Sequence, residues 1–233
     1  MTDTLTSAPD LAAKRRALFP GETSDYAAAR QSLLAEEIEL RRQLERVAER
    51  RRRLPMGPVI AKDYRFLDAN GAELGLADLF GPHDTLVTFF WMFGPQRARP
   101  CPMCTSFVGP IDANANDIKQ RVALKILSRS PVARQLAFAR ERGWTRVDFL
   151  QTVGDDYARD LGILSVEGGE EGALVVFRKD GDHIRLFWGE EIRGEMADPG
   201  QDPRGALEMT PLWNMLDLTP AGRDPDWYPK LNY

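Results

Sequence analysis

Residues 86–104 read LVTFFWMFGPQRARPCPMC, and this stretch decides the fold. Its first part, Leu86–Trp91, is an apolar run rich in β-branched and aromatic residues, as expected for a strand buried on both faces. A loop containing glycine and proline follows, and Cys101 and Cys104 then stand where a helix can begin. The stretch therefore predicts a buried strand, a loop, and a helix that opens with two cysteines.

Two thiols at C-x-x-C spacing can reach each other across one helical turn, within disulfide range. The first sulfur then faces the free amides and the positive end of the helix, which lower its pKa, and Arg97 and Arg99 could add to this effect. Such a thiolate is the nucleophile of thiol–disulfide exchange. We therefore predict Cys101 as the nucleophile and Cys104 as the resolving cysteine.

Other uses of the two cysteines need residues that the chain hardly offers. A zinc site takes about four ligands, and the remaining soft candidates are His83 and His183, which are not closely spaced. Covalent haem requires histidine directly after the second cysteine, where Thr105 stands. We expect neither a metal nor a cofactor. Two buried, chemically inert cysteines remain an open alternative.

Composition limits the class of protein further. The chain has 233 residues, a formal net charge of −4 and only two cysteines, which argues against nucleic-acid wrapping and excludes a disulfide-stapled secreted scaffold. Residues 1–10 are polar and show no secretory signal, and residues 86–93 are too short an apolar run to cross a bilayer. We expect a cytoplasmic protein with no membrane or nucleic-acid partner.

Strand and helix patterns alternate along the rest of the chain. Strands are predicted at 59–60, 64–67, 86–91 and 122–127, a terminal hairpin at 173–178 and 184–188, and helical segments at 76–80, 105–120, 130–142 and 155–161. Asn70-Gly71 and Asp180-Gly181 supply turn pairs. Such alternation predicts a layered α/β sheet with an antiparallel pair at its end.

Several segments together resemble a known family. They are KDYRF (62–66), LADLF (76–80), FWMFG (90–94), CPMC (101–104), SRSP (128–131), RGW (142–144) and LDLTPAGR (216–223). In these segments the chain resembles the bacterial thioredoxin-like family of predicted dithiol-disulfide oxidoreductases of unknown function. The resemblance implies a thioredoxin-like central mixed sheet flanked by helices, and a redox chemistry mapped to Cys101 and Cys104.

The chain departs from two related patterns. Thioredoxins place a cis-proline before the terminal hairpin, opposite the C-x-x-C, but residues 168–173 contain no proline. Peroxiredoxins carry Pro and Thr or Ser seven and three residues before the reactive cysteine, whereas Gly94 and Ala98 stand there for Cys101, and Arg97 and Cys101 for Cys104. Recognition of a peptide-like disulfide is therefore in question, and a peroxidase of that type is disfavoured.

We divide the chain into a weakly ordered N-terminus (1–24), an amphipathic helix (25–55), a thioredoxin-like domain (56–210) and a C-terminal extension (211–233). On the helix, Leu33, Leu40, Leu44 and Val47 share one narrow face, and a lone helix of this kind is marginal in water. We expect this face to be buried, first in a homodimer with an antiparallel partner helix and second against the protein's own globular domain.

Two functions follow from these predictions. The first is a thiol-disulfide oxidoreductase that cycles Cys101 and Cys104, with an unidentified thiol or disulfide substrate and an unidentified electron donor. The alternative is a catalytically inactive thioredoxin-like protein that serves binding or assembly. The reactivity of the Cys101 thiol separates the two.

Overall fold

The computed structural model describes residues 5–17, 20–165, 168–191, 196, 210–220 and 227–233. The chain divides into two compact units, Met1–Pro55 and Met56–Tyr233. The predicted domain boundary at 210 borders residues 197–209, which lie outside the described residues, as do residues 221–223 of the LDLTPAGR segment.

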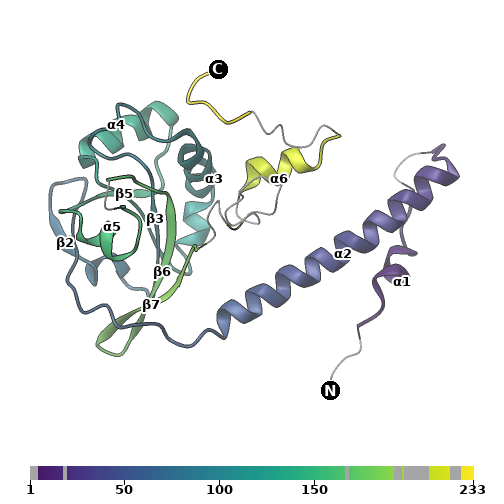
Figure 1. Ribbon diagram of the computed structural model, residues 1–233, viewed down its shortest axis with the longest axis horizontal. Helices are drawn as coiled ribbons and strands as arrows, with labels where there is room; N and C mark the ends of the chain where they lie inside the picture. The colour runs from purple at the N-terminus through teal and green to yellow at the C-terminus, as the bar shows by residue number, and fades with distance from the viewer. Residues whose placement is uncertain (1–4, 18–19, 166–167, 192–195, 197–209, 221–226) are drawn as a thin grey trace. The chain divides into compact units, whose positions relative to one another are not determined.

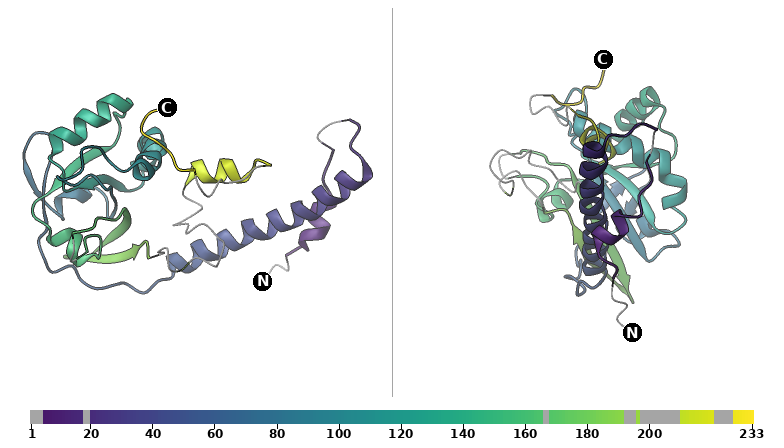
Figure 2. Two further views of the ribbon diagram at one scale, coloured as in Figure 1. Left: turned by 45° about the horizontal axis from the view of Figure 1, so that its top comes forward. Right: turned by 90° about the vertical axis from the view of Figure 1, so that its right-hand side faces the viewer.

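The first unit is a pair of helices, α1 (Ala8–Ala12) and α2 (Ser24–Arg52). Thr23 caps α2 by accepting a hydrogen bond from the Tyr26 backbone N–H, and neither proline nor glycine interrupts the 29 residues that follow. Three consecutive arginines in the last turn suit the negative end of the helix dipole. The helix α1, which the sequence analysis does not predict, lies alongside α2 in both Figure 1 and Figure 2 and buries Ala8 and Ala12.

The second unit is built on one seven-stranded mixed sheet with the order β2-β1-β5-β4-β3-β6-β7. The strands are β1 (Arg65–Leu67), β2 (Glu73–Gly75), β3 (Thr85–Phe90), β4 (Ala123–Ser128), β5 (Asp148–Thr152), β6 (Ala173–Asp180) and β7 (His183–Gly189). The central strands β3, β4 and β5 run parallel. Strand β6 pairs antiparallel with β3 and forms the terminal hairpin with β7. This is the mixed thioredoxin-like sheet that the sequence predicts.

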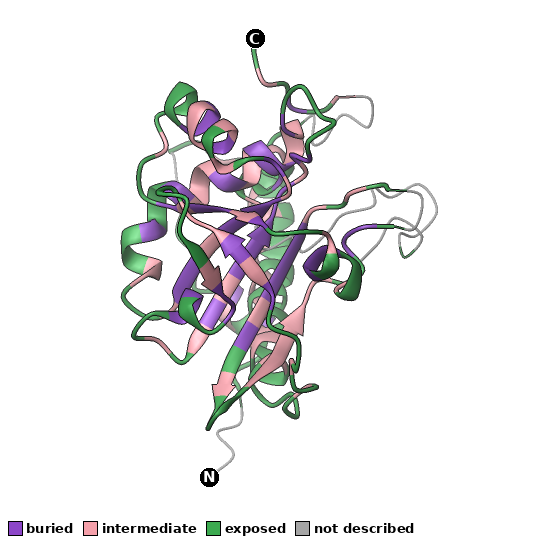
Figure 3. Ribbon diagram, turned by 90° about the vertical axis from the view of Figure 1, so that its left-hand side faces the viewer, coloured by how far each residue is buried: buried purple, intermediate pink, exposed green. Residues whose placement is uncertain are grey.

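Helices cover both faces of this sheet. The helices α3 (Pro102–Ile118) and α4 (Val132–Arg142) pack on one face, where Val108 and Phe138 join the core. The other face is covered by the short helices η1 (Asp78–Phe80) and α5 (Asp156–Asp160), with Tyr157 fully buried among aromatic rings. Figure 3 shows the buried residues concentrated in the central strands. The sheet is thus covered by helices on both sides.

Three local predictions differ from the structure. The pair Val59-Ile60 forms only an isolated bridge to Arg185 instead of a strand. The helical segment expected from residue 130 begins at Val132 with Pro131 as its N-cap, and the Ser130 hydroxyl is buried without a hydrogen-bond partner. The strand β5 is not predicted, because Asp148 and Gln151 interrupt its apolar run.

The C-terminal segment packs on the second unit. Helix α6 (Pro211–Asp217) contacts α3 and buries Trp213, whose ring meets those of Trp227 and Tyr228 edge-on. The Arg142 guanidinium donates a hydrogen bond of 2.9 Å to the carbonyl of Leu231. The aromatic rings thus pack within the extension, while α6 and Leu231 connect it to α3 and to Arg142 at the end of α4.

Candidate functional site

The two cysteines lie where β3 leads through a loop into α3, the helix that packs on the same face of the sheet as α4. Cys101 is the N-cap residue of α3, and Pro102, with its fixed φ, occupies the first helical position. The Cys101 backbone N–H donates to the Met92 carbonyl at 3.0 Å, which ties the start of the helix to the end of the strand. The Cys101 carbonyl accepts from the hydroxyl of Thr105 at 2.9 Å.

The two thiols differ in exposure. Cys101 is half-buried, whereas Cys104, one turn further along, is only 6% exposed. The Met92 backbone N–H points to the Cys104 sulfur at 3.5 Å. An attacking molecule therefore reaches Cys101 more readily than Cys104.

The two thiols also differ in acidity. The Cys104 thiol is the main cause that lowers the pKa of Cys101, to about 6, and the backbone amides of Met103 and Cys104 lower it further, against the opposing effect of burial. The pKa of Cys104 is raised, first by its interaction with Cys101 and then by burial. The first sulfur is therefore held as a thiolate near neutral pH while the second keeps its proton.

The two arginines of the preceding loop do not act alike. Arg97 contributes to the lowered pKa of Cys101 through its charge. Arg99 instead forms an ion pair of 2.7 Å with Glu141 and lies over the ring of Phe138. The expectation that both arginines stabilise the Cys101 thiolate therefore holds for Arg97, whereas the charge of Arg99 is engaged by Glu141.

The segment leading into β6 lies against Cys104, at the place where a thioredoxin carries its cis-proline. A Cβ atom built on Gly172 would lie 3.1 Å from the Cys104 sulfur and 3.7 Å from the carbonyl oxygen of Phe90. The described residues contain no cis peptide bond. Gly172 thus lets the backbone approach the second cysteine closely, without a proline.

A buried carboxylate in the same segment escaped the sequence analysis. The side chain of Glu170 is only 6% exposed, accepts a hydrogen bond of 2.9 Å from the Gly94 backbone N–H, and pairs with Arg129 at 3.1 Å. Arg129 in turn pairs with Asp155 at 2.7 Å, which lowers the pKa of that carboxyl. This network holds the loop between β3 and the cysteines in place. In the sequence, this network is indicated only by charged residues that lie far apart in the chain.

Trp91 belongs to the core beneath the loop. Its side chain is fully buried, its indole N–H donates to the Gln135 amide oxygen at 3.1 Å, and its ring contacts those of Phe93 and Trp144. The buried Gln135 amide donates in turn to two backbone carbonyls, those of Ser130 and Leu150. Trp91 therefore supports the loop from within.

Neither histidine takes part in the site. His83 precedes β3 and His183 begins β7, where it is exposed. Within the described part of the chain, no group of three or more His, Cys, Asp or Glu side chains could hold a metal ion. What the structure does bring together is the cysteine pair, Arg97 and the segment 170–172.

A mixed sheet with a C-x-x-C at the start of a helix packed on its central parallel strands defines a thioredoxin-like protein. A family model matches residues 13–233, so the chain belongs to the family described as "Bacterial protein of unknown function (DUF899)". Among curated proteins, none matches the sequence.

Solved structures with similar folds include proteins named as peroxiredoxins and a thioredoxin. Peroxidoxin BcpB from Mycobacterium tuberculosis is 21% identical, with 57% of this chain and 82% of that chain covered and a TM-score of 0.42. The reduced 2-Cys peroxiredoxin of Plasmodium vivax is 13% identical, with 57% and 81% covered and a TM-score of 0.42. The lipoprotein thioredoxin Etrx1 of Streptococcus pneumoniae is 13% identical, with 54% and 87% covered and a TM-score of 0.39. At these values the similarity says nothing about the chemistry of this chain.

No helix in the described ranges is both long enough and apolar enough to cross a membrane.

Proposed function

We propose that the protein is a dithiol–disulfide oxidoreductase in which Cys101 is the nucleophile and Cys104 the resolving cysteine. The Cys101 thiolate attacks one sulfur of a substrate disulfide, forms a mixed disulfide and releases the other sulfur as a thiolate, which takes up a proton. Cys104 then loses its proton and attacks the Cys101 sulfur, which releases the second substrate thiol. The substrate gains two electrons, the protein gains a Cys101–Cys104 disulfide, and an external dithiol donor returns it to the reduced form.

The observation that carries this proposal is the opposite shift of the two thiol pKa values at two residues that differ in exposure. Attack requires an accessible thiolate, and resolution requires a second thiol that stays protonated until the mixed disulfide has formed. Cys101, half-buried and with a lowered pKa, meets the first requirement. Cys104, buried and with a raised pKa, meets the second. An accessible thiolate beside a buried, protonated thiol is the arrangement that exchange requires.

The surroundings of the pair favour a small or weakly held substrate. In thioredoxins the cis-proline segment pairs with the substrate chain, and here Gly172 occupies that place without a cis bond. The cytoplasm, where thiols are kept reduced, is the compartment that suits a dithiol used as a reductant. We therefore place the substrate, a thiol or disulfide, and the electron donor there.

The test follows exchange with a simple aromatic disulfide in the wild-type full chain and in two variants of it. The wild-type protein should release two equivalents of thiol and end with an intramolecular disulfide. Cys104→Ser should release one equivalent and remain as a stable mixed disulfide at Cys101, and Cys101→Ser should react slowly or not at all. Full activity of Cys101→Ser, or a wild-type protein whose two thiols never join, would contradict the proposal.

The alternative, an inactive thioredoxin-like assembly protein, is favoured by a different observation, the exposed apolar face of α2. The same experiment separates the two functions, because an assembly protein needs no exchange at Cys101. Homodimer formation is compatible with both functions.

A further inference from the structure

Helix α2 carries an apolar stripe, made of Tyr26, Leu33, Leu40, Leu44 and Val47, of which all but the half-buried Val47 are exposed. Within the first unit, none of the 29 residues of the helix is buried. Tyr26, Leu33 and Leu40 are 55%, 53% and 60% exposed. A helix of this length, about 43 Å, owes its stability in water mainly to the packing of an apolar face. Something outside the described contacts should therefore cover this stripe.

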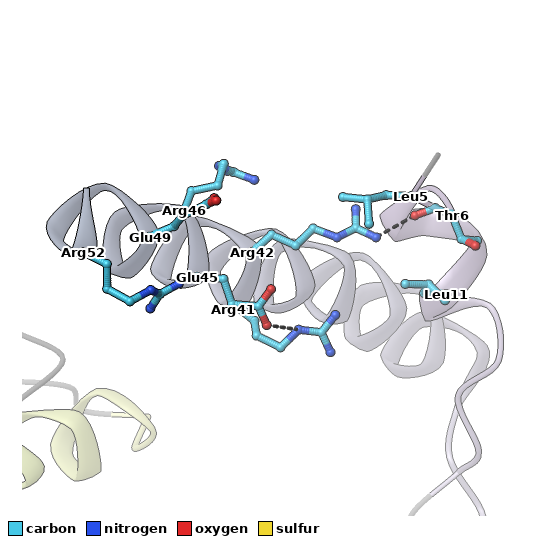
Figure 4. A pocket seen from close by; sticks show the side chains of 9 residues that line it. All are labelled: Leu5, Thr6, Leu11, Arg41, Arg42, Glu45, Arg46, Glu49 and Arg52. Carbon is cyan, nitrogen blue, oxygen red and sulfur yellow. Dashed lines mark hydrogen bonds and ion pairs between the residues drawn. The ribbon is translucent and has the colours of Figure 1, made fainter. Parts of the chain in front are cut away.

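The helix α1 does not cover it. The hollow between α1 and α2 has a volume of about 680 Å³ and is lined on the α2 side by charged residues: Arg41, Arg42, Glu45, Arg46, Glu49 and Arg52. Figure 4 shows these side chains together with Leu5, Thr6 and Leu11, and Arg42 donates to the Thr6 carbonyl at 2.6 Å. No residue of the stripe lines this hollow. The stripe thus lies on another side of α2.

One apolar position of the stripe recurs with the seven-residue spacing of a coiled coil. Tyr26, Leu33, Leu40 and Val47 follow one another at intervals of seven residues, and Leu54, just beyond the helix, continues the series. A repeat of seven keeps one seam in contact with a partner helix along its whole length. The series is also symmetric about Leu40. An antiparallel copy therefore places Leu40 opposite Leu40 and Leu33 opposite Val47.

The distribution of charge along α2 favours one orientation of the partner helix. The first half of the helix, residues 24–39, carries four carboxylates and one arginine, whereas residues 41–53 carry seven arginines and two glutamates. A parallel pair would set the arginine-rich halves side by side, which is unfavourable. An antiparallel pair sets each basic half against an acidic half. We propose that the stripe of α2 is a homodimer interface in which two copies of α2 pack antiparallel about Leu40.

The proposal does not depend on the redox function. Its test measures the molecular mass of the protein in solution, and not its activity. Sedimentation or light scattering of the full chain at micromolar concentration should give about twice the chain mass of 26.2 kDa. Leu40→Glu brings two carboxylates face to face at the centre of the interface and should halve that mass. Leu40 is 60% exposed, so its loss leaves the fold of the chain intact, which circular dichroism checks.

A matched control introduces the same charge on another face. Ala28 is exposed and lies well away from the stripe around the helix, so Ala28→Glu should leave the dimer unchanged. A monomeric wild-type protein, whether its stripe is covered by its own second unit or left open, would overturn the proposal. A Leu40→Glu variant that stays dimeric would also overturn it, because the interface would then lie elsewhere.

Two further measurements address the orientation. Antiparallel charge pairing predicts that the dimer dissociation constant rises about tenfold between ~0.05 M and ~0.5 M salt. In chains lacking Cys101 and Cys104, a mixture of Leu33→Cys and Val47→Cys variants should form a disulfide between position 33 of one copy and position 47 of the other. Preferential linkage of position 33 to position 33, or a dimer that tightens with salt, would refute the antiparallel arrangement.

Discussion

Replacement of Cys104 by alanine should raise the pKa of Cys101. The interaction with the Cys104 thiol is the first cause of the low Cys101 pKa, about 6, and alanine removes it. The amides of Met103 and residue 104 and the charge of Arg97 remain and still lower the pKa, while burial remains and raises it. We expect a rise of roughly 1–2 units.

The assay is the pH dependence of alkylation by iodoacetamide. A cysteine reacts as its thiolate, so the rate rises with pH through the pKa and then reaches a plateau. In the wild-type protein the first alkylation should have its midpoint near pH 6 and be largely complete by neutral pH. In Cys104→Ala the midpoint should lie at higher pH, and in Cys104→Ser, which keeps a hydroxyl donor, it should lie between the two.

The decisive quantity is the midpoint of the pH profile of alkylation, and not the rate at a single pH. A more basic thiolate is a better nucleophile, with a Brønsted coefficient of about 0.4–0.5, so the loss of thiolate at neutral pH is largely offset by a higher plateau. A comparison at pH 7 alone could therefore show little change. An unshifted midpoint in Cys104→Ala, with the fold intact by circular dichroism, would refute the idea that Cys104 stabilises the Cys101 thiolate.

Three other substitutions test the surroundings of the site and the tail. Glu170→Gln keeps the shape of the side chain but weakens its hydrogen bond with the Gly94 backbone N–H. In urea titrations it should lower the free energy of unfolding by about 1–3 kcal/mol. An unchanged urea midpoint would show that the carboxylate charge is dispensable. Gly172→Ala places a methyl group 3.1 Å from the Cys104 sulfur, so thermal unfolding should reveal a loss of about 1–3 kcal/mol, whereas full stability would mean that the loop yields freely. Trp213→Ala removes a buried ring and should cost about 2–4 kcal/mol; a wild-type melting curve would indicate that the C-terminal extension contributes nothing.

Local sequence patterns were sufficient to predict the strand, the loop and the cysteine-bearing helix. An apolar run followed by proline, C-x-x-C and a helical segment needs only neighbouring residues to be interpreted, and the structure has β3 and α3 at these places. The hairpin β6–β7 was predicted in the same way from its Asp180-Gly181 turn. Nearest-neighbour chemistry determines these elements, so tertiary contacts did not change them.

The charges around the site could not be predicted in this way. Arg97 and Arg99 stand two residues apart in one loop, and nothing local distinguishes them. Only the fold brings Glu141 to Arg99 and leaves the charge of Arg97 acting on Cys101. The anchor of Gly94 likewise comes from Glu170, 76 residues further along the chain. Partners at such separations are set by the topology of the sheet, which a single sequence does not reveal.

The segment leading into β6 explains how this chain manages without the proline of thioredoxins. A cis-proline there has two structural effects: it brings the backbone close to the cysteines, and it fixes the loop rigidly. In this chain Gly172 provides the close approach, because it has no Cβ to meet the Cys104 sulfur. Glu170 provides the fixation, because its carboxylate joins the segment to Gly94 and to Arg129. Gly172 and Glu170 together thus provide the two structural effects of the proline. The described residues contain no cis peptide bond, and this is the physical reason to propose a substrate other than an extended peptide.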